Sequence, residues 1–170
     1  MNSPSGVALH YALRSSISIL TGQHMRRHRI YDFATPLSSE AMDHSYPVLL
    51  RESGYRTGFL GKMAVGNPTE GIRHLSLPAD KFDFWYGFPQ SINFRQTVDG
   101  EERFLTTLMT EKAIEFLQTN PADRPFCLSI SFKEPHGPWN FFDPDTPNPY
   151  ENTEIPLPAT CARENYESQP

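Results

Sequence analysis

Apolar side chains recur at helical spacing between residues 104 and 118 and alternate with polar side chains between residues 126 and 132. The first pattern predicts a helix over 104–118, which the Asn120-Pro121 pair ends. The second pattern predicts a strand, because successive side chains of a strand point to opposite faces. Its apolar members are Phe126, Leu128, Ile130 and Phe132.

Weaker patterns predict two helical stretches nearer the start of the chain. Residues 15–20 suit a short helix that ends at Gly22. Residues 38–53 suit a second helical stretch, with a serine cap at its start and Gly54 as its stop. Pro47 lies inside this stretch, so it predicts either a break or a new first turn at that point.

Short extended segments separate these helices. Residues 55–60 predict a strand, residues 82–88 a strand or packed loop, and residues 94–98 one arm of a hairpin before the Asp99-Gly100 turn. A helix followed by a strand occurs twice along the chain, which predicts an α/β fold with a mostly parallel sheet.

Two polar residues follow predicted strands and are therefore candidate site residues. In parallel sheets, ligands bind beyond the carboxyl ends of the strands. Lys62 follows the strand at 55–60, and His136 follows the strand at 126–132. Without further information, a lysine after a strand is more commonly plain surface, and a histidine in a proline-rich turn is more commonly structural.

Composition excludes several classes of protein. The 170 residues suffice for one domain, and the net charge of -5 gives no support for nucleic-acid binding. The basic stretch Arg26–Arg29 is short enough to be a solvated loop or helix end. Neither a membrane span nor a signal peptide is expected, and two cysteines define no disulfide framework or metal site. Localisation and oligomeric state are left unassigned.

Half of the sixteen prolines fall from Glu134 onward. This density is incompatible with regular helix or a central strand, so residues 134–170 are predicted to be a loop or arm on the surface.

Four stretches in order carry a family resemblance. They are L-T-G at 20–22 with the following residues 23–28, E-S-G-Y-R-T-G-F-L-G-K at 52–62, F-D-F-W-Y-G-F at 82–88 and S-F-K-E-P-H-G-P-W at 131–139. Together they resemble the formylglycine-dependent sulfatases, from about Ser18 onward. The resemblance implies a partial alkaline-phosphatase-like sandwich, incomplete at both ends. It divides the chain into a non-family segment at 1–16, a partial α/β domain at 17–133 and the proline-rich arm at 134–170.

The resemblance also implies a chemistry, the hydrolysis of sulfate esters. In this family a cysteine in a C-x-P-S-R segment becomes formylglycine, and calcium stabilises the sulfate oxygens. The lysine of the G-K element and the histidine of the P-H-x-P element contact the sulfate or the leaving group. These positions are Lys62 and His136, and the implied ligand is a sulfated small molecule or glycan.

The sequence departs from the family pattern at the positions that matter most. Counting back from Gly22, the nucleophile position falls on Ala12 and the arginine position on Ser16. A histidine common two residues after the lysine is replaced by Ala64. The calcium ligands are not found either, and Asp143 and Asp145 are not expected to serve as ligands. No cofactor is therefore expected for this chain, although intact relatives hold calcium.

Three interpretations stay open. The first is a sulfatase-family fragment that is catalytically inactive and, with unpaired strand edges, unstable by itself. The second is a non-enzymatic binder of sulfated glycans that uses Lys62, His136 and Arg26–Arg29. The third is a phosphatase or phosphodiesterase of the same superfamily using Ser15 or Ser16, against which the absent metal ligands also count.

Overall fold

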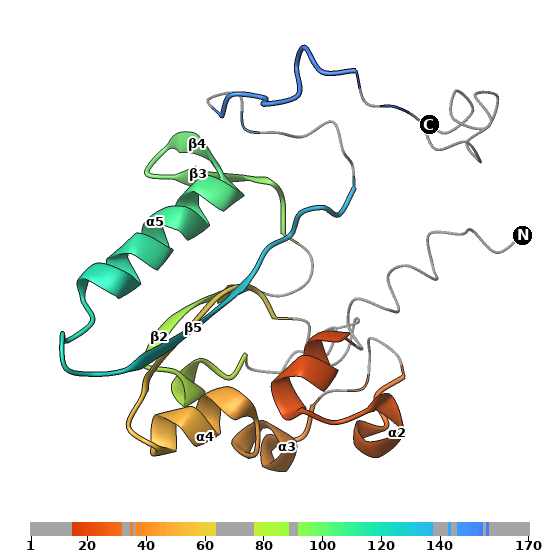
Figure 1. The fold of residues 1–170 in the computed structure, drawn as a ribbon, viewed down its shortest axis with the longest axis vertical. Helices are drawn as coiled ribbons and strands as arrows, with labels where there is room; N and C mark the ends of the chain where they lie inside the picture. The colour runs from red at the N-terminus through yellow and green to blue at the C-terminus, as the bar shows by residue number, and fades with distance from the viewer. Residues whose placement is uncertain are drawn as a thin grey trace, which may run out of the picture.

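A three-stranded parallel sheet organises the fold (Figure 1). The computed structural model describes residues 15–31, 35, 37–63, 77–88, 92–137, 143, 146–154 and 156. Strand β1 (Arg56–Lys62) lies between β2 (Phe84–Phe88) and β5 (Phe126–Ser131), and both neighbours run parallel to it. The predicted α/β class with a parallel sheet is confirmed.

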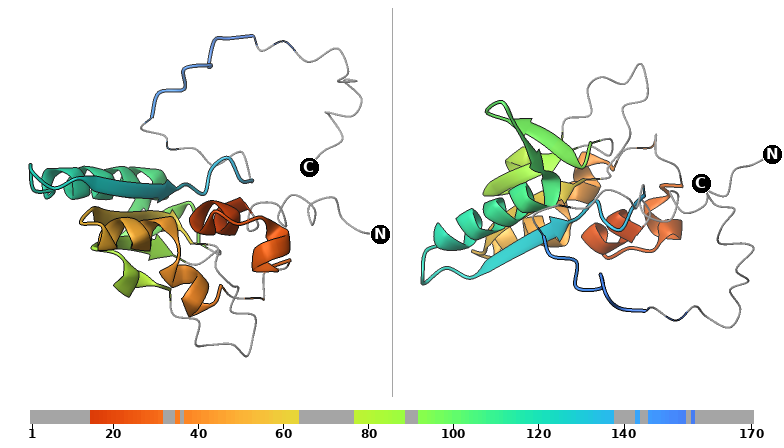
Figure 2. Two further views of the ribbon diagram at one scale, coloured as in Figure 1. Left: turned by 60° about the horizontal axis from the view of Figure 1, so that its bottom comes forward. Right: turned by 90° about the horizontal axis from the view of Figure 1, so that it is seen from above.

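Helices cover both faces of the sheet, as Figures 1 and 2 show. Helix α5 (Leu105–Gln118) packs on one face, and α3 (Ser39–Asp43) and α4 (Tyr46–Glu52) lie on the other. Successive side chains of β1 point to opposite faces of the sheet. Phe59 packs in the hydrophobic cluster that contains residues of α3 and α4, and Leu60 packs in the one that contains residues of α5. The central strand is therefore buried along most of its length.

The helices begin and end where the sequence places its caps. Residues 15–21 are helical and Gly22 follows with φ +64°. Ser38 caps α3 by accepting the Ala41 N–H at 3.1 Å. The predicted stretch at 38–53 is two helices, because α4 starts anew with Pro47 in its first turn, where the absent N–H costs nothing.

A hairpin leads into α5. Strands β3 (Arg95–Val98) and β4 (Glu101–Phe104) pair antiparallel around Asp99 and Gly100, whose φ values of 53° and 87° suit a tight hairpin turn. Two short elements complete the fold, α2 (Met25–His28) and the 3₁₀ turn Ala79–Lys81. The basic stretch predicted as a loop or helix end forms α2's final residues and its C-cap, Arg29.

Strand β5 and the residue after it, Phe132, leave apolar side chains partly in solvent. In the sheet of described strands, β5 has β1 on one side only. Phe126 is 46% exposed, Ile130 41% and Phe132 47%. The alternation that predicted this strand therefore does not mark a fully buried one. None of the described helices is both long and apolar enough to cross a membrane.

Candidate functional site

Lys62 lies at the edge of the sheet where its parallel strands end. It is the last residue of β1 and is in register with Phe88, the last residue of β2, while Gly61 is in register with Ser131, the last residue of β5. Ligands of parallel α/β folds bind at this edge. The structure thus places Lys62 where the sequence predicted, and its chemical role stays a prediction.

A cavity of about 140 Å³ opens beside Lys62. It brings together residues from the 15–21 helix, from the start of α4 and from the carboxyl ends of β1 and β5. The lining residues are Ser16, Ile19, Leu20, Tyr46, Phe59, Lys62, Met63, Ser129, Ile130 and Ser131. Ser16, the residue at the family's arginine position, therefore shares one cavity with Lys62. We call this the Lys62 cavity.

Burial and a second lysine both lower the pKa of Lys62. Burial lowers the pKa of Lys62, and the positive charge of Lys133 lowers it further. Lys133, just beyond β5, donates a hydrogen bond to the Ile92 carbonyl and places its ammonium 3.9 Å from the centre of the Phe94 ring. The end of the sheet therefore carries two cations. Sequence patterns gave no sign of Lys133, because its effect depends on the alignment of β1 with β5.

His136 lies beyond β5 and is exposed. Its Nδ1 is 2.7 Å from the Gly137 carbonyl oxygen. Since a carbonyl can only accept, Nδ1 carries the proton, and Nε2 is the acceptor of the neutral ring. His136 is not among the described residues that line the Lys62 cavity. The structure therefore unites Lys62 with Ser16 but does not bring His136 into the same cavity.

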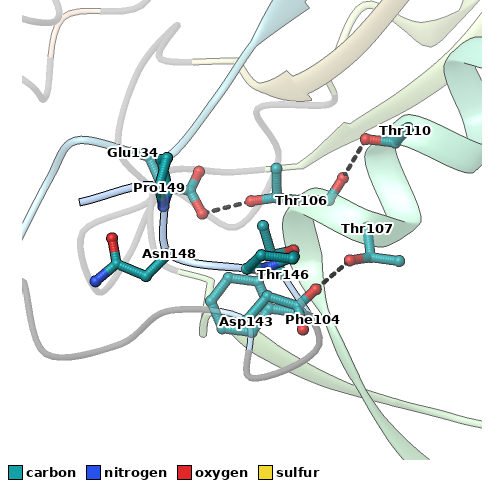
Figure 3. A pocket seen from close by; sticks show the side chains of 10 residues that line it. Phe104, Thr106, Thr107, Thr110, Glu134, Asp143, Thr146, Asn148 and Pro149 are labelled. Atoms are coloured by element: carbon teal, nitrogen blue, oxygen red, sulfur yellow. Dashed lines mark hydrogen bonds between the residues drawn. The ribbon is translucent and has the colours of Figure 1, made fainter. Parts of the chain in front are cut away.

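A second pocket lies against the first turn of α5, and Figure 3 shows its side chains. It has a volume of about 460 Å³ and is called here the α5 pocket. The Thr106 hydroxyl donates a hydrogen bond to the Glu134 carboxylate, and the Thr107 hydroxyl donates one to the Asp143 carboxylate. Each oxygen–oxygen distance is 2.5 Å. The lining residues are Phe104, Thr106, Thr107, Thr110, Glu134, Asp143, Thr146, Pro147, Asn148 and Pro149.

A third hollow, of about 600 Å³, lies by α2 and α3 and includes Arg27, Arg29 and His44. His28, also in its wall, accepts the Ile30 N–H at Nδ1 (3.1 Å), so its Nε2–H faces Ser18 Oγ at 3.2 Å. Burial lowers the pKa of His28, which keeps the ring in this neutral form. The exposed arginines therefore supply the positive charge of this hollow, called here the α2 hollow.

The described residues do not provide a calcium site. No three histidine, cysteine, aspartate or glutamate side chains among them gather closely enough to hold a metal ion. Asp143, one of the two loop aspartates, is instead bound by Thr107. Ala12, Ala64 and Asp145 lie outside the described residues. The domain boundaries at residues 16 and 133 stay predictions.

Comparisons with known proteins give a consistent result. The chain is 27% identical to N-acetylglucosamine-6-O-sulfatase of Bacteroides thetaiotaomicron over 168 residues, which is 91% of this chain and 27% of that protein. It is 28% identical to N-acetylglucosamine-6-sulfatase of Capra hircus, covering 84% of this chain and 29% of the relative. The chain thus spans less than a third of the length of these relatives.

Solved structures agree with the sequence comparisons. BT4656, solved in complex with its substrate D-glucosamine-2-N,6-O-disulfate, matches with a TM-score of 0.59 and 26% identity, over 86% of this chain and 29% of that one. The protein Ps i-CgsB, solved with a neocarrahexaose, matches with a TM-score of 0.57 at 20% identity, over 74% of this chain and 35% of that one. The second match supports the fold alone, and together they agree with the alkaline-phosphatase-like class.

The model of the family described as Sulfatase matches residues 8–166. That range includes every described residue and both predicted site residues. The chain belongs to the sulfatase family.

Proposed function

We propose that this chain binds the sulfate group of a sulfate ester at the carboxyl end of β1, with Lys62 as the principal cation. The observation that carries the proposal is the position of Lys62, half-buried in a cavity at the edge of the sheet. A partly desolvated ammonium attracts sulfate oxygens more strongly than an exposed one, because the local dielectric constant is lower. Lys133 adds positive charge at the same edge.

The ligand we propose is a sulfated sugar. Two of the relatives are by name N-acetylglucosamine 6-sulfatases, and BT4656 was solved with a disulfated glucosamine. His136 would contact a hydroxyl of the leaving-group sugar: its Nδ1–H is engaged by Gly137, which leaves Nε2 to accept from that hydroxyl. Binding of this kind needs no metal ion, so EDTA should leave the affinity unchanged.

We further propose that residues 1–170 alone bind the ester without hydrolysing it. Ala12 offers no nucleophile, and the Ser16 hydroxyl at the Lys62 cavity cannot replace the two-pronged grip of a guanidinium. Loss of a nucleophile costs several orders of magnitude in rate.

The test of this inactivity is release of 4-nitrophenol from 4-nitrophenyl sulfate. The wild-type chain and Lys62→Ala should both match the rate in buffer. Turnover by the wild type that Lys62→Ala abolishes would refute the inactivity and would assign Lys62 to catalysis.

A second candidate function, binding of a longer sulfated glycan, is favoured by the α2 hollow. Its Arg27 and Arg29 are exposed, and His44 lines the same hollow. If a sulfated glycan binds there, the chain should be retained on a heparin column. The variant that carries both Arg27→Ser and Arg29→Ser should then elute at lower salt than the wild type. Arg95→Ser removes an exposed arginine elsewhere, on β3, and serves as the control. Equal elution of the double variant and the control would exclude this function for the hollow.

A further inference from the structure

The α5 pocket differs in charge from the Lys62 cavity. Two of its described lining residues, Glu134 and Asp143, are acidic and none is basic. Two carboxylates repel a sulfate group, which carries charge of the same sign. The remaining lining consists of threonine hydroxyls, an asparagine, two prolines and the Phe104 ring. This pocket therefore suits a ligand that brings hydroxyl groups and an apolar ring face.

One of the two carboxylate oxygens of Glu134 accepts no hydrogen bond from the described residues. One oxygen of its carboxylate accepts the Thr106 hydroxyl hydrogen. The other, Oε2, is buried and has no hydrogen-bond partner among the described residues. Buried carboxylate oxygens are almost always hydrogen-bonded, so Oε2 has an unused capacity to accept a hydrogen bond.

Asn148 supplies a complementary group and also lines the α5 pocket (Figure 3). Its Oδ1 accepts the Tyr150 N–H at 3.0 Å, which holds the side chain in place. The two hydrogens on Nδ2 stay available as donors. The pocket thus offers a fixed acceptor at Glu134 and a fixed donor at Asn148, the pair that a hydroxyl-bearing sugar ring requires.

We propose that the α5 pocket binds an unsulfated sugar ring that neighbours the sulfated ring in the same glycan. The inference rests on the proposed function, since the segment from Lys133 to His136 joins the two places. Glu134 contributes to the α5 pocket, while Lys133 contributes charge to the Lys62 cavity. One glycan can therefore be bound at two points: cations bind its sulfate group, and neutral and acidic groups bind its unsulfated ring.

The experiment is an NMR titration of the 170-residue chain that follows backbone amides. N-acetylglucosamine is the unsulfated probe, and sodium sulfate, compared with sodium chloride at matched ionic strength, is the anionic one. The amides of Thr106, Thr107, Thr146 and Asn148 should shift saturably with the sugar and not with sulfate. The absence of saturation up to about 50 mM, the weak end of measurable affinity, would overturn the proposal, as would an equal response to sulfate.

Two variants sharpen the test. Glu134→Gln keeps an acceptor for Thr106 but replaces the unpartnered oxygen, and Asn148→Asp keeps the acceptor for Tyr150 but removes the donors. Each should weaken the sugar at least about fivefold, the loss of one hydrogen bond. Glu115→Gln removes the same charge as Glu134→Gln, but on helix α5 and outside the pocket, and should change nothing. Unchanged affinity in both pocket variants would overturn the proposal.

A titration with glucosamine 6-sulfate separates this inference from the proposed function. In one outcome, glucosamine 6-sulfate shifts the amides of Lys62 and its neighbours, and Lys62→Ala abolishes these shifts, but N-acetylglucosamine does not shift the amides of the α5 pocket. That outcome would refute the sugar subsite and support the sulfate site. In the other outcome, N-acetylglucosamine shifts the amides of the α5 pocket, but the sulfated sugar causes no shift that depends on Lys62. That outcome would support the sugar subsite and refute the proposed function.

Discussion

A β-carbon on Gly61 would lie 2.0 Å from the carbonyl oxygen of Ser131 on the neighbouring strand. Gly61 also has φ +99°, a backbone conformation that side chains disfavour. The close approach lets β1 and β5 stay paired up to the point where Lys62 begins the site. The glycine before the lysine is thus a structural requirement of the candidate site.

Gly61→Ala should therefore destabilise the fold by more than about 3 kcal/mol, since the clash is with backbone that cannot move aside cheaply. Gly100→Ala is the matched control: φ is +87°, but nothing lies within 4 Å of the added carbon. It should cost only about 1–2 kcal/mol. Urea unfolding followed by circular dichroism measures both. Equal losses would show that the approach to Ser131 is not tight.

Asp83 joins the far end of the sheet to two arginines. It accepts from the Thr57 N–H at 2.9 Å and from Arg51 at 3.0 Å, and Arg124 lies at 3.2 Å. Burial by itself would raise the pKa of Asp83, but the Thr57 N–H and the arginines outweigh it and lower the pKa below 3.8.

Because the folded-state pKa of Asp83 is lowered, its contribution to stability is complete above 3.8 and is lost as the pH falls through the folded-state value. Asp83→Asn should cost about 1–3 kcal/mol at pH 7, and should remove this part of the acid sensitivity. Glu102→Gln, which breaks the exposed pair with Arg95, should cost less than about 0.5 kcal/mol. Denaturant midpoints between pH 7 and pH 3 would test both expectations. A D83N variant that loses stability with acid as steeply as the wild type would contradict the assignment.

The lowered pKa of Lys62 predicts how anion binding depends on pH. Burial and Lys133 hold it below the usual 10.5, so the ammonium loses its proton at a lower pH than an exposed lysine does. Affinity for a sulfated sugar should fall as the pH rises through this lowered value. Lys62→Arg keeps its charge to much higher pH, so its affinity should stay flat over the same range. Calorimetric titrations along a pH series measure the difference, and parallel curves would exclude Lys62 as the titrating group.

The exposed apolar residues of and beyond β5 predict self-association of the isolated chain. An unpaired edge with Phe126, Ile130 and Phe132 partly in solvent is a site for aggregation. Phe132→Lys should raise the monomer fraction in size-exclusion chromatography with light scattering. Gln118→Lys adds the same charge at the end of α5 and should not. Equal monomer fractions for Phe132→Lys and the wild type would contradict this expectation.

Local patterns in the sequence predicted most of the elements correctly. The apolar spacing of α5 and the alternation of β5 were sufficient, since both depend on neighbours within a few residues. Pro47 allowed a break or a new start, and the structure shows a new helix. The four-residue α2 was not predicted as a helix of its own, because so short a segment carries no period.

The candidate site was less predictable because it depends on distant pairings. Lys62 could be placed from its strand alone, but Lys133 acts on it only through the alignment of β1 and β5. The bonds of Thr106 and Thr107 to carboxylates 28 and 36 residues further along the chain leave no local signature. His136 is not among the described residues that line the Lys62 cavity, and its contact with the sulfate or the leaving group, implied by its motif, stays a prediction.

The affinity of the chain for glucosamine 6-sulfate, measured by calorimetry, tests the central claim most directly. Lys62→Ala should weaken binding at least about tenfold, the loss of one partly buried charge–charge contact. Lys112→Ala removes an exposed lysine paired with Glu115 and should bind as the wild type does. Circular dichroism would confirm that both variants are folded. Equal affinities for Lys62→Ala and the wild type would contradict the account, because the sulfate would then be held elsewhere.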